Sequence, residues 1–220
     1  YMISGANSFP QNEVMDWVSN RVYSFNSIVR ALDNKMDNKV DNAKYPILEV
    51  TKKYDQVLVI GGGNSIIDHY DAIKEFLKLY PNTAIILSTA RHAKLFHDLE
   101  QPLFYCLVGN EAHRLTKNVG KTKFKGTCVL PPYPRTMGTE VPVYAQNYTF
   151  ELAEVSFVDE YMDSVTTIAL QLALNLTDKE IFFVGYDGYP GSVLSEKEVA
   201  LSTENNTIFN AFTAVKGRKP

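Results

Sequence analysis

The chain has 220 residues, of which 45% are apolar and 21% are charged, and its formal net charge is −3. This composition is typical of a globular domain, and dispersed basic residues in an acidic chain argue against a nucleic-acid partner. No apolar run approaches the roughly 18 residues that a membrane span needs, so we expect no membrane partner. Cys106 and Cys128 lie in apolar runs without a disulfide or metal-binding spacing, which favours a cytoplasmic protein.

Residues 1–45 are predicted to form a small helical appendage followed by a polar linker. Helical periodicity covers 11–20 and 24–36, and in the second segment apolar residues recur at i, i+3, i+4 and i+7. Two short helices cannot bury a core by themselves, so we expect them to pack on the next domain or on a part that is missing from this chain. The remaining residues, 46–220, are expected to form that separate domain. Because the chain begins with Tyr1 rather than Met, we expect a processed product or an excised fragment.

Strands and helices alternate from Gln56 onward. Short apolar runs predict buried strands at 56–60, 84–88, 103–108, 127–130 and 180–184. Amphipathic patterns predict helices at 66–80, 90–96, 110–117, 164–176 and 196–214, whereas 144–157 fits neither pattern. This alternation predicts a Rossmann-like α/β fold, with a mostly parallel sheet and helices on both faces. Ligands of such sheets bind at the carboxyl ends of the strands, near the switch in strand order.

A glycine-rich turn, Gly61-Gly62-Gly63-Asn64-Ser65, joins the first predicted strand to the first helix. Glycines let the backbone approach a ligand closely, and the start of a helix offers N–H groups to an anion. We therefore predict a site for a phosphate-bearing small molecule, with a tight turn that binds nothing as the alternative. The turn is not a Walker A loop, because no Gly-Lys-[Ser/Thr] follows it. Ile66 also stands where an NAD fingerprint needs its third glycine.

Further candidate ligand-binding residues follow the other predicted strands. Arg91 follows the second strand and is predicted to contact a phosphate or carboxylate, unless it is a solvated surface residue. Asn110 and Glu111 follow the third strand and are candidates for ribose, base or substrate hydroxyls, or else an ordinary helix start. Arg135 lies on the proline-rich segment 131–138, where its guanidinium offers a fork to phosphate or carboxylate. The alternative for this segment is a structural corner.

Asp187 follows the last predicted strand, inside the sequence Gly185-Tyr186-Asp187-Gly188-Tyr189. A short acid between glycines at the carboxyl edge of a sheet can hold Mg²⁺, a ribose or a substrate hydroxyl. A plain Asp-Gly turn is the alternative. We predict Asp187 to be the catalytic or metal-holding residue, close in space to the glycine turn.

Two other polar positions receive structural rather than functional predictions. The four histidines share no spacing typical of a zinc site. His92 is next to Arg91, and we expect it on the surface, with a position facing the cleft as the alternative. Asn is unfavourable in a helix interior, so we expect the polar segment 204–206 to break the last helix.

Two segments of the α/β region resemble a known Rossmann-like family. Val59–Ser65 together with Val184–Tyr189 resembles the family of archaeal hydroxymethylpterin diphosphokinases and their sialyltransferase relatives. Its glycine loop usually reads Gly-x-Gly-Pro-Ser, and Asn64 replaces the proline here. The resemblance implies that Gly61, Gly63 and Ser65 lie at the nucleotide phosphates and that Asp187 lies near the ribose or the metal.

Residues 1–45 resemble the end of a hydroxymethylglutaryl-CoA-lyase-like aldolase of the 4-hydroxy-2-oxovalerate aldolase type. The likeness is carried by Ser4–Pro10 and by a helix that ends in Ile28–Asp33. Some bacterial members carry a Rossmann-like domain after the aldolase barrel, which the segments 109–111, 131–138 and 185–189 resemble. The resemblance implies a parent carbon–carbon lyase whose metal ligands and catalytic base lie outside this chain.

The sequence thus predicts the C-terminal domain of an aldolase-type protein. Its expected ligand at the glycine turn is a nucleotide, a nucleotide-sugar or a phosphorylated metabolite, and its expected partner is the aldolase barrel of the same polypeptide. Two alternatives stay open. One is an autonomous transferase that moves a diphosphoryl or glycosyl group with the help of Mg²⁺, and the other is a non-catalytic scaffold that docks the barrel.

Overall fold

The computed structural model of the protein describes residues 43–135, 139–189 and 194–217. By its internal contacts the chain divides into residues 1–40 and residues 41–220, and the described residues all belong to the second unit. The two helices predicted near the N-terminus lie outside the described residues.

A six-stranded sheet forms the centre of the described unit. Its strands are β1 (Gln56–Ile60), β2 (Thr83–Leu87), β3 (Leu103–Cys106), β4 (Thr127–Leu130), β5 (Thr149–Glu151) and β6 (Glu180–Val184). All neighbouring strands are parallel, in the order β5-β4-β3-β2-β1-β6. The predicted Rossmann-like α/β fold is confirmed. The strand β5 lies in the segment that fits neither pattern, because only three of its residues pair.

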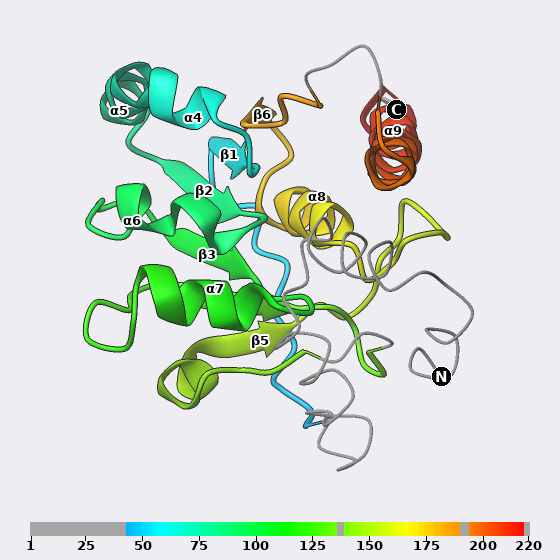
Figure 1. Ribbon diagram of the computed structural model, residues 1–220. Helices are drawn as coiled ribbons and strands as arrows, with labels where there is room; N and C mark the ends of the chain where they lie inside the picture. The colour runs from blue at the N-terminus through cyan, green and yellow to red at the C-terminus, as the bar shows by residue number, and fades with distance from the viewer. Residues whose placement is uncertain (1–42, 136–138, 190–193, 218–220) are drawn as a thin grey trace, which may run out of the picture. The chain divides into compact units, whose positions relative to one another are not determined.

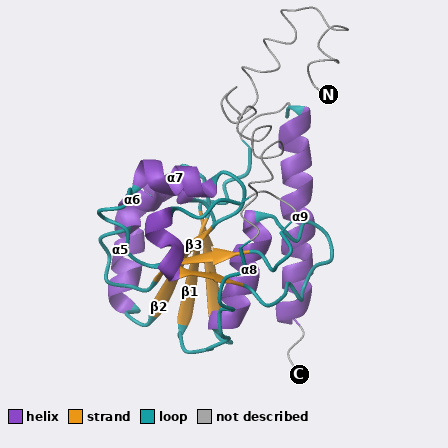
Figure 2. Cartoon of the chain, turned by 90° about the horizontal axis from the view of Figure 1, so that it is seen from below, coloured by secondary structure: helices purple, strands orange, loops and turns teal. Residues whose placement is uncertain are grey.

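Helices cover both faces of this sheet. They are α4 (Ser65–Asp68), α5 (Tyr70–Leu79), η1 (Ala90–His92), α6 (Ala93–Phe96), α7 (Glu111–Asn118), η2 (Val143–Tyr148), α8 (Val165–Leu176) and α9 (Glu196–Gly217). Figures 1 and 2 show α5, α6 and α7 on one face and α8 and α9 on the other. Within the described part of the chain, no helix is long and apolar enough to cross a membrane.

Each central strand contributes side chains to two apolar cores. Val57 and Val59 of β1 pack into the core that contains α8 residues, whereas Leu58 and Ile60 pack into the core that contains α5, α6 and α7 residues. Because successive side chains of a strand point to opposite faces, a strand covered on both faces must be apolar throughout. This explains why β1 and β2 are continuous apolar runs rather than alternating ones.

Two helices differ from the sequence predictions. The helix predicted over 66–80 is divided at His69 into α4 and α5. The expected break at 204–206 is wrong, because α9 continues through these residues. Asn205 is accommodated by a tertiary contact, since its Oδ1 accepts a 2.9 Å hydrogen bond from Thr166 Oγ1 of α8. A specific partner on the neighbouring helix therefore offsets the low helix propensity of asparagine.

The strand order reverses direction at β1. The chain moves away from β1 through β2 to β5 and then returns to the other side of β1 as β6. The loops that follow β1 and β6 are consequently neighbours, and Gly63 N donates to Gly185 O over 2.7 Å. A methyl group on Gly61 would lie closer than 3.0 Å to the carbonyl oxygen of Gly185. Glycine at position 61 is thus needed for this close approach.

Replacing Gly61 with alanine should lower the free energy of unfolding by about 3 kcal/mol, since backbone rather than a flexible side chain blocks the new methyl group. The matched control is Gly188→Ala. Gly188 has a φ of 73°, but no atom lies within 4 Å of the place that a methyl group would take, so only backbone strain of about 1 kcal/mol is expected. Urea unfolding of both variants checks the difference. Equal losses would contradict the close approach of the two loops.

Candidate functional site

The glycine turn and Asp187 contact each other at the carboxyl edge of the sheet. Ser65 N donates a 2.9 Å hydrogen bond to Asp187 Oδ2, and Ser65 Oγ donates to Asp187 Oδ1. Figure 1 shows the turn into α4 beside the end of β6. We call residues 61–65, Arg91, His92 and Asp187 the loop–Asp187 site. It lies at the switch in strand order, where ligands of open α/β sheets bind.

Asp187 is an exposed carboxyl group whose pKa is lowered. The hydrogen bond from the Ser65 hydroxyl lowers its pKa below the ordinary value of 3.8, and the Ser65 N–H lowers it further. Both donors stabilise the ionised form. A group with such a pKa is a weak base at neutral pH, where efficient proton abstraction needs a pKa near the working pH. The geometry therefore favours Asp187 as a holder of a cation or a hydroxyl over a general base.

Arg91 joins the glycine turn from the neighbouring strand. It follows β2, and its Nη1 donates to Gly62 O over 2.7 Å while its Nη2 donates to Asn64 Oδ1 over 3.1 Å. The side chain is exposed, so its positive charge is accessible from solvent. Arg91 thus fixes the turn and places a guanidinium group within the same site as Asp187.

His92 is a part of the site that the sequence prediction placed on the surface. The prediction is wrong, because His92 is only 8% exposed and its Nε2 donates to Gly62 O over 3.3 Å. The cause is the short helix η1, which turns the chain back under the glycine turn directly after β2. Sequence periodicity cannot reveal this orientation, since η1 has only three residues.

Glu111, the first residue of α7, holds the η1 turn in place. Its Oε2 accepts hydrogen bonds from Ala90 N over 2.8 Å and from Thr89 Oγ1 over 3.0 Å. The side chain is buried and also pairs with Arg114. The Glu111 carboxylate thus holds Thr89 and Ala90, the two residues directly before Arg91. Asn110, the N-cap of α7, is exposed instead. Of the two candidates after β3, Asn110 is the one whose side chain solvent can reach.

Arg135 lies apart from the other candidates. Its Nη1 donates to Glu151 Oε2 over 2.9 Å, and the two side chains are 1% and 6% exposed. Its Nη2 donates to the carbonyl oxygen of Ala43. Glu151 belongs to β5, and three strands separate β5 from β1. The structure therefore brings together the turn 61–65, Arg91 and Asp187, but it places Arg135 in a buried ion pair elsewhere.

No metal site is complete among the described residues. Within residues 43–135, 139–189 and 194–217, no group of three or more His, Cys, Asp or Glu side chains is arranged to hold a metal ion. Any Mg²⁺ at Asp187 would need further ligands from water or from a bound molecule.

Comparison of the chain with protein-family models, with curated proteins and with solved structures finds no match to any of them. The resemblances to the diphosphokinase-like family and to the aldolase therefore stay predictions.

The lowered pKa of Asp187 predicts a stability contribution that depends on pH. Its ionised form is favoured in the folded state, so the contribution is present above pH 3.8 and is lost as the pH falls below that value. Asp187→Asn should cost at most about 1 kcal/mol at pH 7, because solvent screens an exposed carboxylate. Urea unfolding at pH 7, 5 and 3 should show this difference shrinking only at pH 3, and a constant difference would contradict the assignment.

Arg135→Met should lower the free energy of unfolding by about 3–5 kcal/mol, since it leaves Glu151 buried without its cation. Adding Glu151→Gln should recover part of the loss, because the remaining group is uncharged. Chemical unfolding of the wild type, both single variants and the double variant measures this coupling. If the stability losses of the two single variants add up to that of the double variant, the ion pair between Arg135 and Glu151 does not stabilise the fold.

Proposed function

We propose that the α/β domain binds a nucleotide, nucleotide-sugar or other phosphorylated metabolite at the loop–Asp187 site, together with Mg²⁺. The observation that carries this proposal is the direct contact between the glycine turn after β1 and the Asp187 carboxylate after β6. The glycine turn, the exposed guanidinium group of Arg91 and the carboxylate of Asp187 lie together at the switch in strand order. Ligands of this fold are expected at that position.

The need for Mg²⁺ follows from the charges in the site. Asp187 already accepts the N–H of Ser65, the first residue of α4, so a phosphate must share the turn with a carboxylate. Two unit negative charges about 4 Å apart repel by about 1 kcal/mol in water and by about 4 kcal/mol at a protein surface. A divalent cation between them converts this repulsion into attraction. Mg²⁺ commonly uses one or two carboxylates with phosphate oxygens and water.

Arg91 is the second group that contacts the phosphate in this proposal, beside the Mg²⁺ held by Asp187. Its guanidinium is exposed beside Gly62 and Asn64, and the backbone of the glycine turn lies next to it. A guanidinium group can bind phosphate oxygens through two parallel hydrogen bonds. The lowered pKa of Asp187 supports ligand or metal holding rather than proton abstraction, which is why binding is preferred here over catalysis by this residue.

Calorimetric titration with ATP, a CMP-sugar and NADPH, each in Mg²⁺ and in EDTA, tests the proposal. At least one of these ligands should bind about tenfold more weakly in EDTA, which corresponds to the repulsion that the metal removes. In Asp187→Asn the two conditions should converge, because the carboxylate charge is gone. Arg91→Gln should weaken binding in both conditions.

Asp71→Asn is the matched control, since Asp71 is an exposed acid of α5 that pairs with Lys74 away from the turn. This variant should leave the affinity for each ligand unchanged, both in Mg²⁺ and in EDTA. If none of the three ligands binds, the binding proposal fails and the scaffold alternative gains. If a ligand binds equally in Mg²⁺ and EDTA, the metal is not part of the site. Turnover of a bound nucleotide that disappears in Asp187→Asn would favour the transferase.

A further inference from the structure

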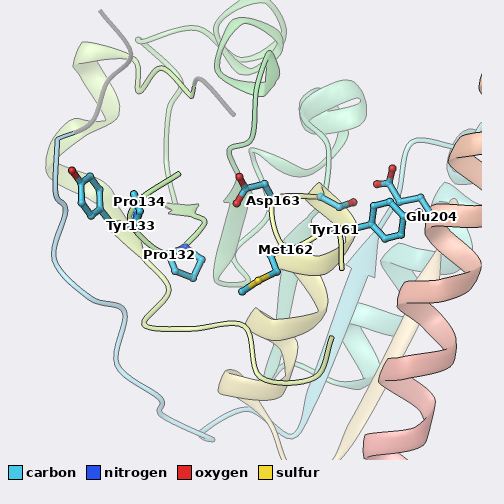
Figure 3. A pocket seen from close by; sticks show the side chains of 8 residues that line it. Pro132, Tyr133, Pro134, Tyr161, Met162, Asp163 and Glu204 are labelled. Carbon is cyan, nitrogen blue, oxygen red and sulfur yellow. The ribbon is translucent and has the colours of Figure 1, made fainter. Parts of the chain in front are cut away.

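A second site is formed by a pocket of about 500 Å³ near the start of α8. Figure 3 shows the side chains that surround it. They come from the segment after β4, from the turn before α8 and from α9, and they are Pro132, Tyr133, Pro134, Tyr161, Met162, Asp163, Ser164 and Glu204. A concave site with mostly apolar walls and a few polar groups is the usual form of a small-molecule site.

The chemistry of the walls selects one class of ligand. Two prolines, a methionine and two tyrosine rings give apolar and aromatic surface, and Asp163 and Glu204 add two acidic groups. None of the eight lining residues is Lys, Arg or His. Aromatic faces and carboxylates both attract cations, and together they recognise ammonium groups that carry apolar substituents. An anionic ligand would meet like charge beside Glu204.

The two ends of the pocket are not equivalent. Lys44 Nζ lies 4.9 Å from the centre of the Tyr133 ring, and Arg135 Cζ lies 5.7 Å from it. Cations of the protein therefore already use the Tyr133 ring. Figure 3 shows Tyr161 and Glu204 on the opposite side of the pocket from Tyr133. A cationic ligand is best placed at the Tyr161–Glu204 end.

The backbone holds Tyr161 in an unusual conformation at this end. Its φ of 54° lies in the left-handed region, which bulky residues rarely adopt. Its carbonyl oxygen accepts hydrogen bonds from Ser164 N over 2.9 Å and from Thr167 Oγ1 over 2.8 Å. These bonds to the first turn of α8 stabilise the strained turn. The backbone at Tyr161 is consequently held at the edge of the pocket.

The negative charge of Glu204 acts on the hydroxyl group of Tyr189. The pKa of Tyr189 is raised first by burial and then by the charges of Glu198 and Glu204. A negative field that disfavours a tyrosinate favours a cation. This effect agrees with the composition of the pocket walls.

From the pocket, its walls and its charge, we propose that this site binds a small organic cation, an ammonium group with apolar substituents, between Tyr161 and Glu204. The proposal goes beyond the nucleotide site and does not depend on it, because the two sites share no residue. A protein that recognises both ligands would bring a phosphorylated compound and an amine to the carboxyl edge of one sheet.

The test uses choline and its uncharged isostere 3,3-dimethylbutan-1-ol as probes, with the five methionine methyl groups labelled for NMR. Choline should shift the Met162 methyl signal with a Kd of about 1 mM, and the isostere should bind at least about fivefold more weakly. Glu204→Gln and Tyr161→Leu should each weaken choline binding by about threefold to fivefold. Glu196→Gln, the same charge change on the exposed start of α9, is the matched control and should have no effect.

Equal affinity for the two probes would show a plain apolar pocket and overturn the proposal. The absence of a Met162 shift, or choline binding unchanged in both Glu204→Gln and Tyr161→Leu, would overturn it as well. Because Asp187→Asn leaves this pocket intact, choline binding in that variant should equal the wild type. The nucleotide proposal and the cation proposal can therefore fail separately.

Discussion

The candidate site depends on the close approach of two loops at the β1–β6 pair. Gly61 contacts the backbone of Gly185 at a distance that excludes any side chain, and this contact brings Asp187 to Ser65. The parallel pairing of β1 with β6 sets the register, and the strand order changes direction at this pair. Arg91 and His92 of η1 donate hydrogen bonds to the carbonyl oxygen of Gly62, and Glu111 of α7 accepts a hydrogen bond from Ala90 N at the start of η1.

Charge sets the second constraint. The described unit carries a carboxylate of lowered pKa at the switch in strand order, where related folds often place a ligand phosphate. In the proposed function, the ligand therefore brings a metal or presents hydroxyls. The pocket before α8 is also acidic, since Asp163 and Glu204 line it. Arg91 is an exposed cation of the loop–Asp187 site, so the two ends of this edge differ in charge.

Sequence patterns predicted much of this arrangement, and the features that they could not predict have physical reasons. Continuous apolar runs predicted β1, β2, β3 and β4, because strands buried on both faces need them. The run at 180–184 also predicted β6, but its expected burial is wrong, because β6 is an edge strand whose residues are exposed or half-buried. The carboxyl-edge rule predicted that the glycine turn and Asp187 would meet. The burial of His92 and the ion pair of Arg135 with Glu151 could not be predicted, since both depend on which strands become neighbours. The three-residue β5 lacks enough length to show a period.

The pairing of β1 with β6 also determines when the site can form. Asp187 and Ser65 are 122 positions apart in sequence, and four other strands are synthesised between them. Contacts of such long sequence separation form late, because most of the chain entropy must first be lost. Until β6 arrives, β1 presents an unpaired apolar edge that can associate with other chains. A ligand that bridges the glycine turn and Asp187 would thus recognise only a chain whose last strand is in place.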